Sequence, residues 1–368
     1  MPLIMNKNIK IGNHIISENS PVFCIGELSC NHLNNYELAM KTIDAMIDAG
    51  VDCIKLQTAK PDKITLNCDS DDFIIKGGTL WDNRTLYSLY VEAQTPWEWH
   101  EPIKDYVESR GVEFLSSPFD KSAVDFLEKL NVSAYKIASF EITDTPLIEY
   151  VASKQKPIII STGIAHKEDI QLAIDTCREV GNNQVILLKC TSEYPTPWED
   201  VNLNMLPRLS ADFDCMVGVS DHTLGDVVPC LSVALGARIV EKHFILNRSL
   251  GGPDSAFSME PHEFESMVER LRISEKTLGR VSYTLSEKNE SSRRFMRSLY
   301  VGCDMKQGDI ITADNVVSVR PGFGLHPKYL KQIVGKKVNA DLKKGTRFSL
   351  SFIAEYYCPL KFFEQLKN

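Results

Sequence analysis

Two lysines of this sequence stand inside apolar stretches, where a charged side chain is unusual. Lys55 lies in CIKLQT and Lys136 in AYKIAS. An unpaired ammonium group is expensive to bury, so we expect each lysine to meet an anion, either a carboxylate of the protein or one carried by a ligand. Serines end several other apolar stretches, and their hydroxyl groups could bind the same anion as the lysines. For any single serine a structural role is an equally good explanation, but the lysines and serines together favour an anion-binding site. These serines are Ser117, Ser139, Ser161, Ser192 and Ser220.

A second constellation has the residue types of a metal site. His222 in SDHT and His243 in EKHF end two consecutive apolar runs, and Glu241 and Glu27 could complete the ligand set directly or through water. Two nitrogen ligands with oxygen and water in the remaining positions suit Mn²⁺ or Mg²⁺ better than a closed zinc site. A single histidine is more often a core residue, but two at neighbouring strand ends favour a divalent ion. His32 in SCNHLNN is a weaker candidate, because it lies beyond its strand and can cap the following helix.

Further charged residues have both a functional and a structural interpretation. Glu27 in GELSCNH could act as a general base or position a water molecule, and its structural alternative is a salt bridge to Lys55. Glu141 and Asp254 lie on loops, where a solvated charge is the usual interpretation. Arg320 in the turn RPGFG is suited to bind a carboxylate or a sugar hydroxyl, although an ordinary surface arginine has the same signature.

Eight short β-branched or apolar runs position these residues, and each run ends in charged or hydroxyl side chains. Each is followed by a stretch of helical periodicity, such as NYELAMKTIDAMIDAG after the first. Eight strand–helix units predict an α/β fold, a (β/α)₈ TIM barrel, whose catalytic groups lie where the strands end. The runs are VFCIGELS, CIKLQT, EFLSSPF, AYKIASFE, PIIISTG, VILLKCTS, MVGVSDH and RIVEKHF.

The pattern divides the chain into four parts. We expect the barrel over residues 1–281, a polar linker over 282–295, a small β-rich domain over 296–355 and a tail over 356–368. In the small domain, DMKQGD and DLKKGT are two similar turn segments that indicate an internal duplication. A long insertion over about 60–94 interrupts the second strand–helix unit, and such loops usually shape the substrate pocket.

Composition excludes several classes of protein. The chain has 368 residues, 43% hydrophobic and 24% charged, with a formal net charge of −8. No block of lysine and arginine stands out, so no nucleic-acid partner is expected. The start lacks the apolar region of a signal peptide and no long uncharged apolar stretch follows, which predicts a cytoplasmic protein that does not bind a membrane. The ten cysteines form no CxxC pair and are expected to be reduced. No GxGxxG, Walker A or GxSxG motif marks dinucleotide, P-loop or α/β-hydrolase chemistry.

Taken together, the motifs resemble those of the sialic acid synthases, a family with a TIM barrel followed by an antifreeze-like (SAF) domain. GELSCNH, IKLQT, SSPFD, YKIASFE, STG, CTSEYP, SDHT, EKHF, GGPD and RPGFGLHP stand in the family's order across nearly the whole chain. Within the family, FIIKGGTLWDNRTLYSLY and SLGGPDSAFSMEPHEF are similar to the branch that makes pseudaminic acid.

The resemblance implies a transferase that condenses phosphoenolpyruvate with the open-chain form of 2,4-diacetamido-2,4,6-trideoxy-L-altrose and releases phosphate by C–O cleavage. His222 and His243 would hold the divalent ion, Mn²⁺ or Mg²⁺, and Glu27 would activate the water that adds at C2. The residues at the family's phosphoenolpyruvate-binding positions are Lys55, Ser117, Lys136, Ser139, Ser161, Ser192 and Ser220. The residues at the positions that contact the sugar are Gln57, Glu141, Tyr194, Asp254 and Arg320. In the family the small domain crosses to the partner's barrel, which implies a domain-swapped homodimer.

The sequence departs from the neuraminate-type pattern in three places. Ser192 stands where those enzymes carry Asn, Ser117 where they carry Thr, and the insertion around 77–86 does not align with their acyl-binding loop. The last mismatch favours pseudaminic acid, with N-acetylneuraminate and legionaminate synthases as alternatives. Two hypotheses belong to other classes: a Schiff-base aldolase with Lys136 or Lys189 as nucleophile, and a non-catalytic protein that binds glycans or ice.

Overall fold

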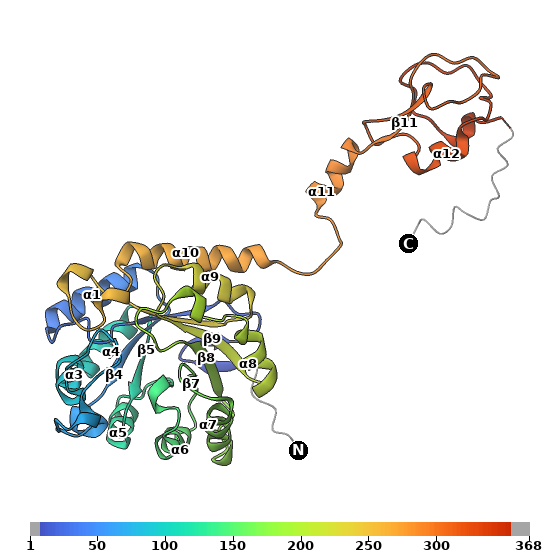
Figure 1. Cartoon of the computed structure of the whole chain (residues 1–368). Coiled ribbons are helices and arrows are strands. Elements are labelled where there is room, and N and C mark those ends of the chain that lie inside the picture. The colour runs from blue at the N-terminus through green and yellow to red at the C-terminus, as the bar shows by residue number, and fades with distance from the viewer. Residues whose placement is uncertain (1–7, 355–368) are drawn as a thin grey trace. The chain divides into compact units, whose positions relative to one another are not determined.

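The computed structural model describes residues 8–354, so the tail expected over 356–368 lies outside the described residues. The chain divides between Gly279 and Arg280 into two compact units, both visible in Figure 1. Of the helices within residues 8–354, none has the length and apolar character needed to cross a membrane.

Eight parallel strands of the first unit close into a barrel, and helices surround them (Figure 1). Neighbouring strands follow in chain order, and β10 closes the ring by pairing with β3. The predicted (β/α)₈ fold is confirmed, and each predicted run contains one strand. The strands are β3 (Phe23–Glu27), β4 (Cys53–Thr58), β5 (Glu113–Pro118), β6 (Tyr135–Ile137), β7 (Ile158–Ser161), β8 (Val185–Cys190), β9 (Met216–Asp221) and β10 (Ile239–His243).

The helices that follow the strands cover the outside of the barrel through apolar faces. In the first of them, Asn35 caps the helix by accepting a hydrogen bond from Leu38 N at 3.0 Å, and Ile43 and Met46 are buried against the strands. The helices are α1 (Tyr36–Asp48), α4 (His100–Ser109), α5 (Lys121–Lys129), α6 (Thr145–Ala152), α7 (Lys167–Glu179), α8 (Met205–Phe213), α9 (Val227–Ala234) and α10 (Pro261–Leu278).

The strand register brings the predicted site residues to one end of the barrel. Glu27, the last residue of β3, pairs in register with Lys55 on β4 and with His243 on β10. On the next pair of strands, Gln57 lies opposite Ser117. Because all eight strands are parallel, the polar residues at their carboxyl ends share the same mouth.

A short hairpin that the sequence pattern did not predict precedes the barrel. It consists of β1 (Ile9–Ile11) and β2 (His14–Ile16), which pair antiparallel. Ile9, Ile11 and Ile16 are buried in one cluster with inward-facing strand residues such as Phe23, whereas Ile15 is exposed. The turn between the strands is tied to the start of β5, where Glu113 Oε1 accepts a hydrogen bond from Asn13 N at 2.8 Å. The hairpin therefore covers the amino-terminal end of the barrel, opposite the mouth.

Two segments outside the regular units carry short helices. The insertion after β4 contains α2 (Pro61–Ile64) and α3 (Leu86–Ala93). Within the expected linker, α11 (Glu287–Ser292) forms behind a cap, because Ser286 Oγ accepts a hydrogen bond from Asn289 N at 3.2 Å. Its side chains are exposed.

The second unit is a small β-rich fold built around strands β11 (Ser298–Val301) and β12 (Val316–Val319), which pair antiparallel. The two similar turn segments noticed in the sequence face each other. Met305 N donates to Leu342 O at 2.8 Å, and Leu342 N returns the bond to Met305 O at 2.9 Å. Ion pairs repeat the symmetry, since Lys306 binds Asp341 at 2.8 Å and Lys343 binds Asp304 at 2.7 Å. This reciprocal pairing supports the predicted duplication.

Candidate active site

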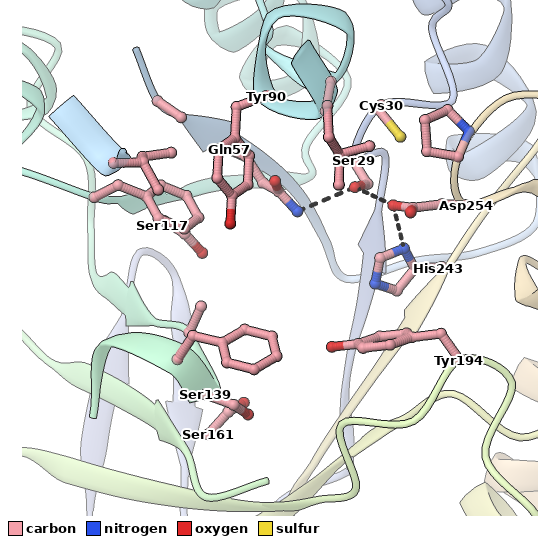
Figure 2. A pocket seen from close by; sticks show the side chains of 18 of the residues that line it. Ser29, Cys30, Gln57, Tyr90, Ser117, Ser139, Ser161, Tyr194, His243 and Asp254 are labelled. Carbon is pink, nitrogen blue, oxygen red and sulfur yellow. Dashed lines mark hydrogen bonds and ion pairs between the residues drawn. The ribbon is translucent and has the colours of Figure 1, made fainter. Parts of the chain in front are cut away.

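A cavity of about 580 Å³ occupies the carboxyl end of the barrel. Most of the residues predicted for the site line it, and Figure 2 shows several of their side chains. Those that line the cavity are Lys55, Gln57, Ser117, Lys136, Ser139, Glu141, Ser161, Tyr194, Ser220, His222, His243 and Asp254, together with Glu241. The strand ends therefore bring cations, hydroxyls, imidazoles and carboxylates into one compartment, as the sequence predicted.

Two lysines and two glutamates form a buried charge cluster at the floor of the cavity. Lys55 makes an ion pair with Glu27, and its Nζ lies 3.8 Å from Glu241 Oε1. Lys136 Nζ lies 3.9 Å from the same Glu241 oxygen. All four residues are 4% exposed or less. Each ammonium thus meets a protein carboxylate, as expected for a buried lysine.

The charges of this cluster depend on one another. Burial lowers the pKa of Lys55, but the carboxylates of Glu241 and Glu27 outweigh that effect and raise it above the ordinary lysine value. Burial raises the pKa of Glu241, and the Lys136 and Lys55 ammonium groups more than reverse this. For Lys136, burial dominates and the pKa is lowered. The pKa of Glu27 is raised, mainly by burial. Glu27 is consequently the carboxyl group of the cluster that most readily takes up a proton.

The predicted serines supply hydroxyl groups around the two lysines. Lys136 Nζ donates to Ser161 Oγ at 2.6 Å, and Lys55 Nζ to Ser117 Oγ at 3.4 Å. Ser220, on β9, donates from its Oγ to Glu241 Oε1 at 3.1 Å. Ammonium and hydroxyl donors on several strands can together hold a phosphate or carboxylate ligand.

Ser192 has a different position from the other serines and does not line the cavity. It lies behind Gly163, where an added Cβ would come within 2.2 Å of Ser192 Oγ and 2.8 Å of Ser139 Oγ. Glycine is required there because two hydroxyl groups approach its backbone. Gly163 N also donates to Ser139 Oγ at 3.1 Å, which fixes that hydroxyl.

The two histidines lie side by side at the mouth, with ring centroids 5.3 Å apart. His222 Nδ1 is 3.1 Å from Thr191 O. Burial lowers the pKa of His243 well below 6.5, so its imidazole is neutral, the form that binds metals. Its Nδ1 lies 3.5 Å from Asp254 Oδ2 and makes no hydrogen bond within residues 8–354. A neutral imidazole held beside a buried carboxylate fits a metal ligand. The described residues contain no cluster of three or more His, Cys, Asp or Glu with metal-site geometry, so water or substrate would have to supply the other ligands.

Two hydrogen bonds and a carboxylate–imidazole contact link Gln57 on β4 to His243 on β10, and Figure 2 shows them. Gln57 Nε2 donates to Ser29 Oγ at 3.0 Å, and Ser29 Oγ donates to Asp254 Oδ2 at 2.5 Å. Asp254 in turn faces His243. Ser29 was missed by the sequence analysis, although it stands in the GELSCNH motif two residues after Glu27. Gln57 and Asp254 are therefore held in place before any sugar arrives.

Four other candidates lie away from the cavity surface. Glu27 is fully buried below Lys55, and its Oε1 accepts from Ser29 N at 3.0 Å. The predicted salt bridge is thus present, while Glu27 does not line the cavity. Lys189 binds Cys190 O at 2.6 Å and points away from the main cavity. The remaining two are His32, buried against Thr95 and Trp99, and Arg320, which belongs to the second unit.

A buried ion pair anchors the two strands that carry the histidines. Lys242 is fully buried, makes an ion pair with Asp221, and donates to Thr223 O at 2.6 Å. We expect Asp221→Asn to lower the free energy of unfolding by about 3 kcal/mol, because it leaves a buried ammonium without its carboxylate. The matched control is Asp226→Asn, which breaks a surface pair with Arg270 and should cost about 1 kcal/mol or less. Urea titration of both variants measures the difference, and equal small losses would contradict the expectation.

The fold and the site together define a class of protein: a TIM-barrel enzyme whose cavity carries buried lysines, hydroxyl groups and a histidine pair, joined to a small β-rich unit. The chain belongs to the NeuB family, whose model matches residues 42–283, and a SAF domain matches residues 297–353.

Curated relatives cover nearly the whole chain. A pseudaminic acid synthase of Campylobacter jejuni is 46% identical over 92% of this chain and 97% of its own length. A pseudaminic acid synthase of Helicobacter pylori is 46% identical over 89% of this chain and 97% of its own. An N,N'-diacetyllegionaminic acid synthase of Legionella pneumophila is more distant, at 35% identity over 93% of this chain and 98% of its own.

Solved structures have the same architecture. An N-acetylneuraminic acid synthetase of Leptospira borgpetersenii, crystallised with citrate, matches with a TM-score of 0.70 at 29% identity, over 79% of this chain and 96% of that one. The spore coat polysaccharide biosynthesis protein SpsE of Bacillus subtilis matches with a TM-score of 0.64 at 32% identity, over 94% and 99%.

Proposed function

We propose that this protein is a pseudaminic acid synthase, a transferase that joins phosphoenolpyruvate to 2,4-diacetamido-2,4,6-trideoxy-L-altrose. The observation that carries the proposal is the 46% identity to two pseudaminic acid synthases over about nine tenths of the chain. The cavity at the barrel mouth supports it, because its polar floor offers ammonium and hydroxyl groups to an anion.

Phosphoenolpyruvate binds at the floor of the cavity in this proposal. Lys55 and Lys136 bind its phosphate and carboxylate, with hydroxyl donors from Ser117, Ser139 and Ser161. Ser220 adds a further hydroxyl, and Ser192 contributes through its contact behind Gly163 rather than by direct exposure. In the absence of ligand the two ammonium groups are neutralised by Glu27 and Glu241. Ligand anions therefore compete with these two carboxylates for the ammonium groups of Lys55 and Lys136.

His222 and His243 hold a divalent ion, Mn²⁺ or Mg²⁺, in this proposal. When bound, the ion polarises the aldehyde oxygen of the sugar. Asp254 orients the ring of His243, and Thr191 O orients that of His222. The protein thereby fixes both imidazoles in advance, so the aldehyde meets a prepared site.

The reaction forms one carbon–carbon bond and, at C2, replaces the C–O bond to phosphate by a C–O bond to water. C3 of the enol phosphate attacks the aldehyde carbon, the aldehyde oxygen takes up a proton to become a hydroxyl group, and water adds at C2 of the resulting cation. Glu27 takes the proton of that water once the ligand anions have drawn Lys55 towards themselves and away from the carboxylate. Phosphate then leaves with its bridging oxygen. Gln57, Glu141, Tyr194 and Asp254 bind the sugar above this centre.

Arg320 completes the site from the partner subunit of a domain-swapped homodimer in this proposal. Charge supports an association of the two kinds of unit. Residues 280–368 contain 16 Lys and Arg against 8 Asp and Glu, whereas residues 1–279 contain 25 against 41. A basic second unit and an acidic barrel attract each other, and salt should weaken that attraction.

Acceptor choice tests the proposed function directly. We expect the diacetamido trideoxy-L-altrose to exceed N-acetylmannosamine in kcat/KM by at least about a hundredfold, because a pocket built for one sugar leaves polar groups unpaired or clashing with the other. Phosphate release from phosphoenolpyruvate with Mn²⁺ measures both acceptors. Equal or better use of N-acetylmannosamine would indicate a neuraminate synthase, and preference for the legionaminate precursor would indicate a legionaminate synthase.

One observation favours a second candidate, the Schiff-base aldolase. Burial lowers the pKa of Lys136, and a desolvated lysine in a cavity has the properties of an amine nucleophile. Borohydride in the presence of a keto acid would then attach the keto acid covalently to Lys136, and a chelator would leave activity intact. Full activity without covalent labelling would eliminate this candidate.

A further inference from the structure

The cavity has a second, apolar side that the proposed reaction does not use. The insertion over residues 60–94 supplies it, between strand β4 and helix α4. Most of the side chains that line the cavity from this segment are apolar or aromatic, and Thr79 and Gln94 are the polar ones. The apolar and aromatic ones are Ile64, Ile75, Trp81, Leu86, Leu89, Tyr90 and Ala93. Leu89 is 8% exposed, so it lies deep in this wall. A cavity that only bound phosphoenolpyruvate would have no need of such a surface.

The insertion is held firmly against the mouth. Ile75 N donates to Arg84 O at 2.8 Å, and Asn83 N returns to Ile75 O at 2.9 Å, so the chain folds back on itself before α3. Trp81 Nε1 donates to Pro253 O at 3.1 Å, in the loop after β10. The Trp81 ring also lies 5.5 Å from that of Tyr194. The apolar wall is therefore tied to the loops that carry Asp254 and Tyr194.

A polar group stands at the edge of the apolar wall. Glu141 lines the cavity, and its Oε2 is buried without a hydrogen-bond partner among residues 8–354. It is close enough to Tyr90 on α3 to raise the pKa of that tyrosine, after the larger effect of burial. An apolar surface beside an unpaired hydrogen-bonding group matches a substituent with a methyl group at its end and an amide before it.

We propose that the insertion forms a subsite for the C4 acetamido group of the acceptor. Its methyl group packs against Leu89 and Ile75, and its amide faces Glu141. This inference rests on the proposed function, since it concerns the acceptor of that reaction. It assigns the choice between acceptors to this segment, because N-acetylmannosamine carries a hydroxyl group at C4.

The test compares Leu89→Ser with two controls. Leu89→Met keeps the volume and the apolar surface of the wall. Leu80→Ser makes the same kind of change at a leucine of the same insertion that is 51% exposed and outside the cavity lining. Each variant is assayed with the natural acceptor and with an analogue that carries a formamido group at C4 and so lacks only the methyl group. Circular dichroism and the KM for phosphoenolpyruvate report whether the barrel is intact.

We expect Leu89→Ser to lower kcat/KM for the natural acceptor about tenfold and for the formamido analogue about twofold or less. Both controls should stay within about twofold, and the KM for phosphoenolpyruvate should not change. An equal loss with both acceptors, or no loss, would overturn the assignment. The assignment would also be overturned if the loss caused by Leu89→Ser disappeared only with an acceptor whose C6 methyl group is replaced by hydroxymethyl. Leu89 would then contact the C6 position and not the C4 acetamido group. Failure of the wild type to release phosphate with any of these sugars would instead refute the proposed function.

Discussion

We expect His222→Ala and His243→Ala each to lose at least about a hundredfold of the condensing activity, because the ion that we propose they hold would supply several kcal/mol of stabilisation to the reacting aldehyde. The fold should survive, since both side chains lie at the mouth rather than in the packed interior of the barrel. EDTA should abolish the activity of the wild type, and Mn²⁺ should restore it. Full turnover in EDTA would contradict the metal site.

A direct binding measurement separates the metal site from activity. Titration calorimetry with Mn²⁺ should give one strong site in the wild type and none in either histidine variant. The matched control is His262→Ala, an exposed histidine on α10, which should bind Mn²⁺ and turn over normally. Undiminished Mn²⁺ binding by both His222→Ala and His243→Ala would show that the ion binds at another site.

We expect two inactive variants to recover activity when their subunits exchange, if Arg320 acts across the dimer. Arg320→Ala alone should then be nearly inactive, because it would lack the guanidinium that we propose binds the sugar. In a mixed dimer with His222→Ala, one site carries both lesions and the other carries neither. Equal mixing makes about half the dimers mixed, each with one intact site of two, so activity should approach about a quarter of the wild type.

The controls for this experiment are simple. Mass measurement of differently tagged chains must show that the subunits have exchanged. Arg347→Ala, another arginine of the second unit, should remain active by itself. Absence of recovery after confirmed exchange would mean that Arg320 acts within its own chain or has no part in the site.

The sequence by itself determined the barrel and most of the polar residues at its mouth. Strand and helix periodicity are local properties, and residues such as Lys136 and Ser161 stand within or directly after their strands. Parallel strands in a closed barrel then bring those ends together whatever the details of packing. The similar turns around Met305 and Leu342 were visible for the same reason, since a repeat needs only comparison of the chain with itself.

Only the tertiary structure decided which of these residues face the cavity. Whether Glu27 reaches the surface depends on Lys55 lying above it, and whether Ser192 does depends on the close approach of Gly163. The hairpin over Ile9–Ile16 and the apolar wall around Leu89 were likewise hidden, because their burial comes from contacts with strands or loops distant in sequence. The local pattern decides whether a segment forms a strand or a helix. The direction and the burial of each side chain depend on packing between segments that are distant in sequence, and the pattern does not show which of these segments are in contact.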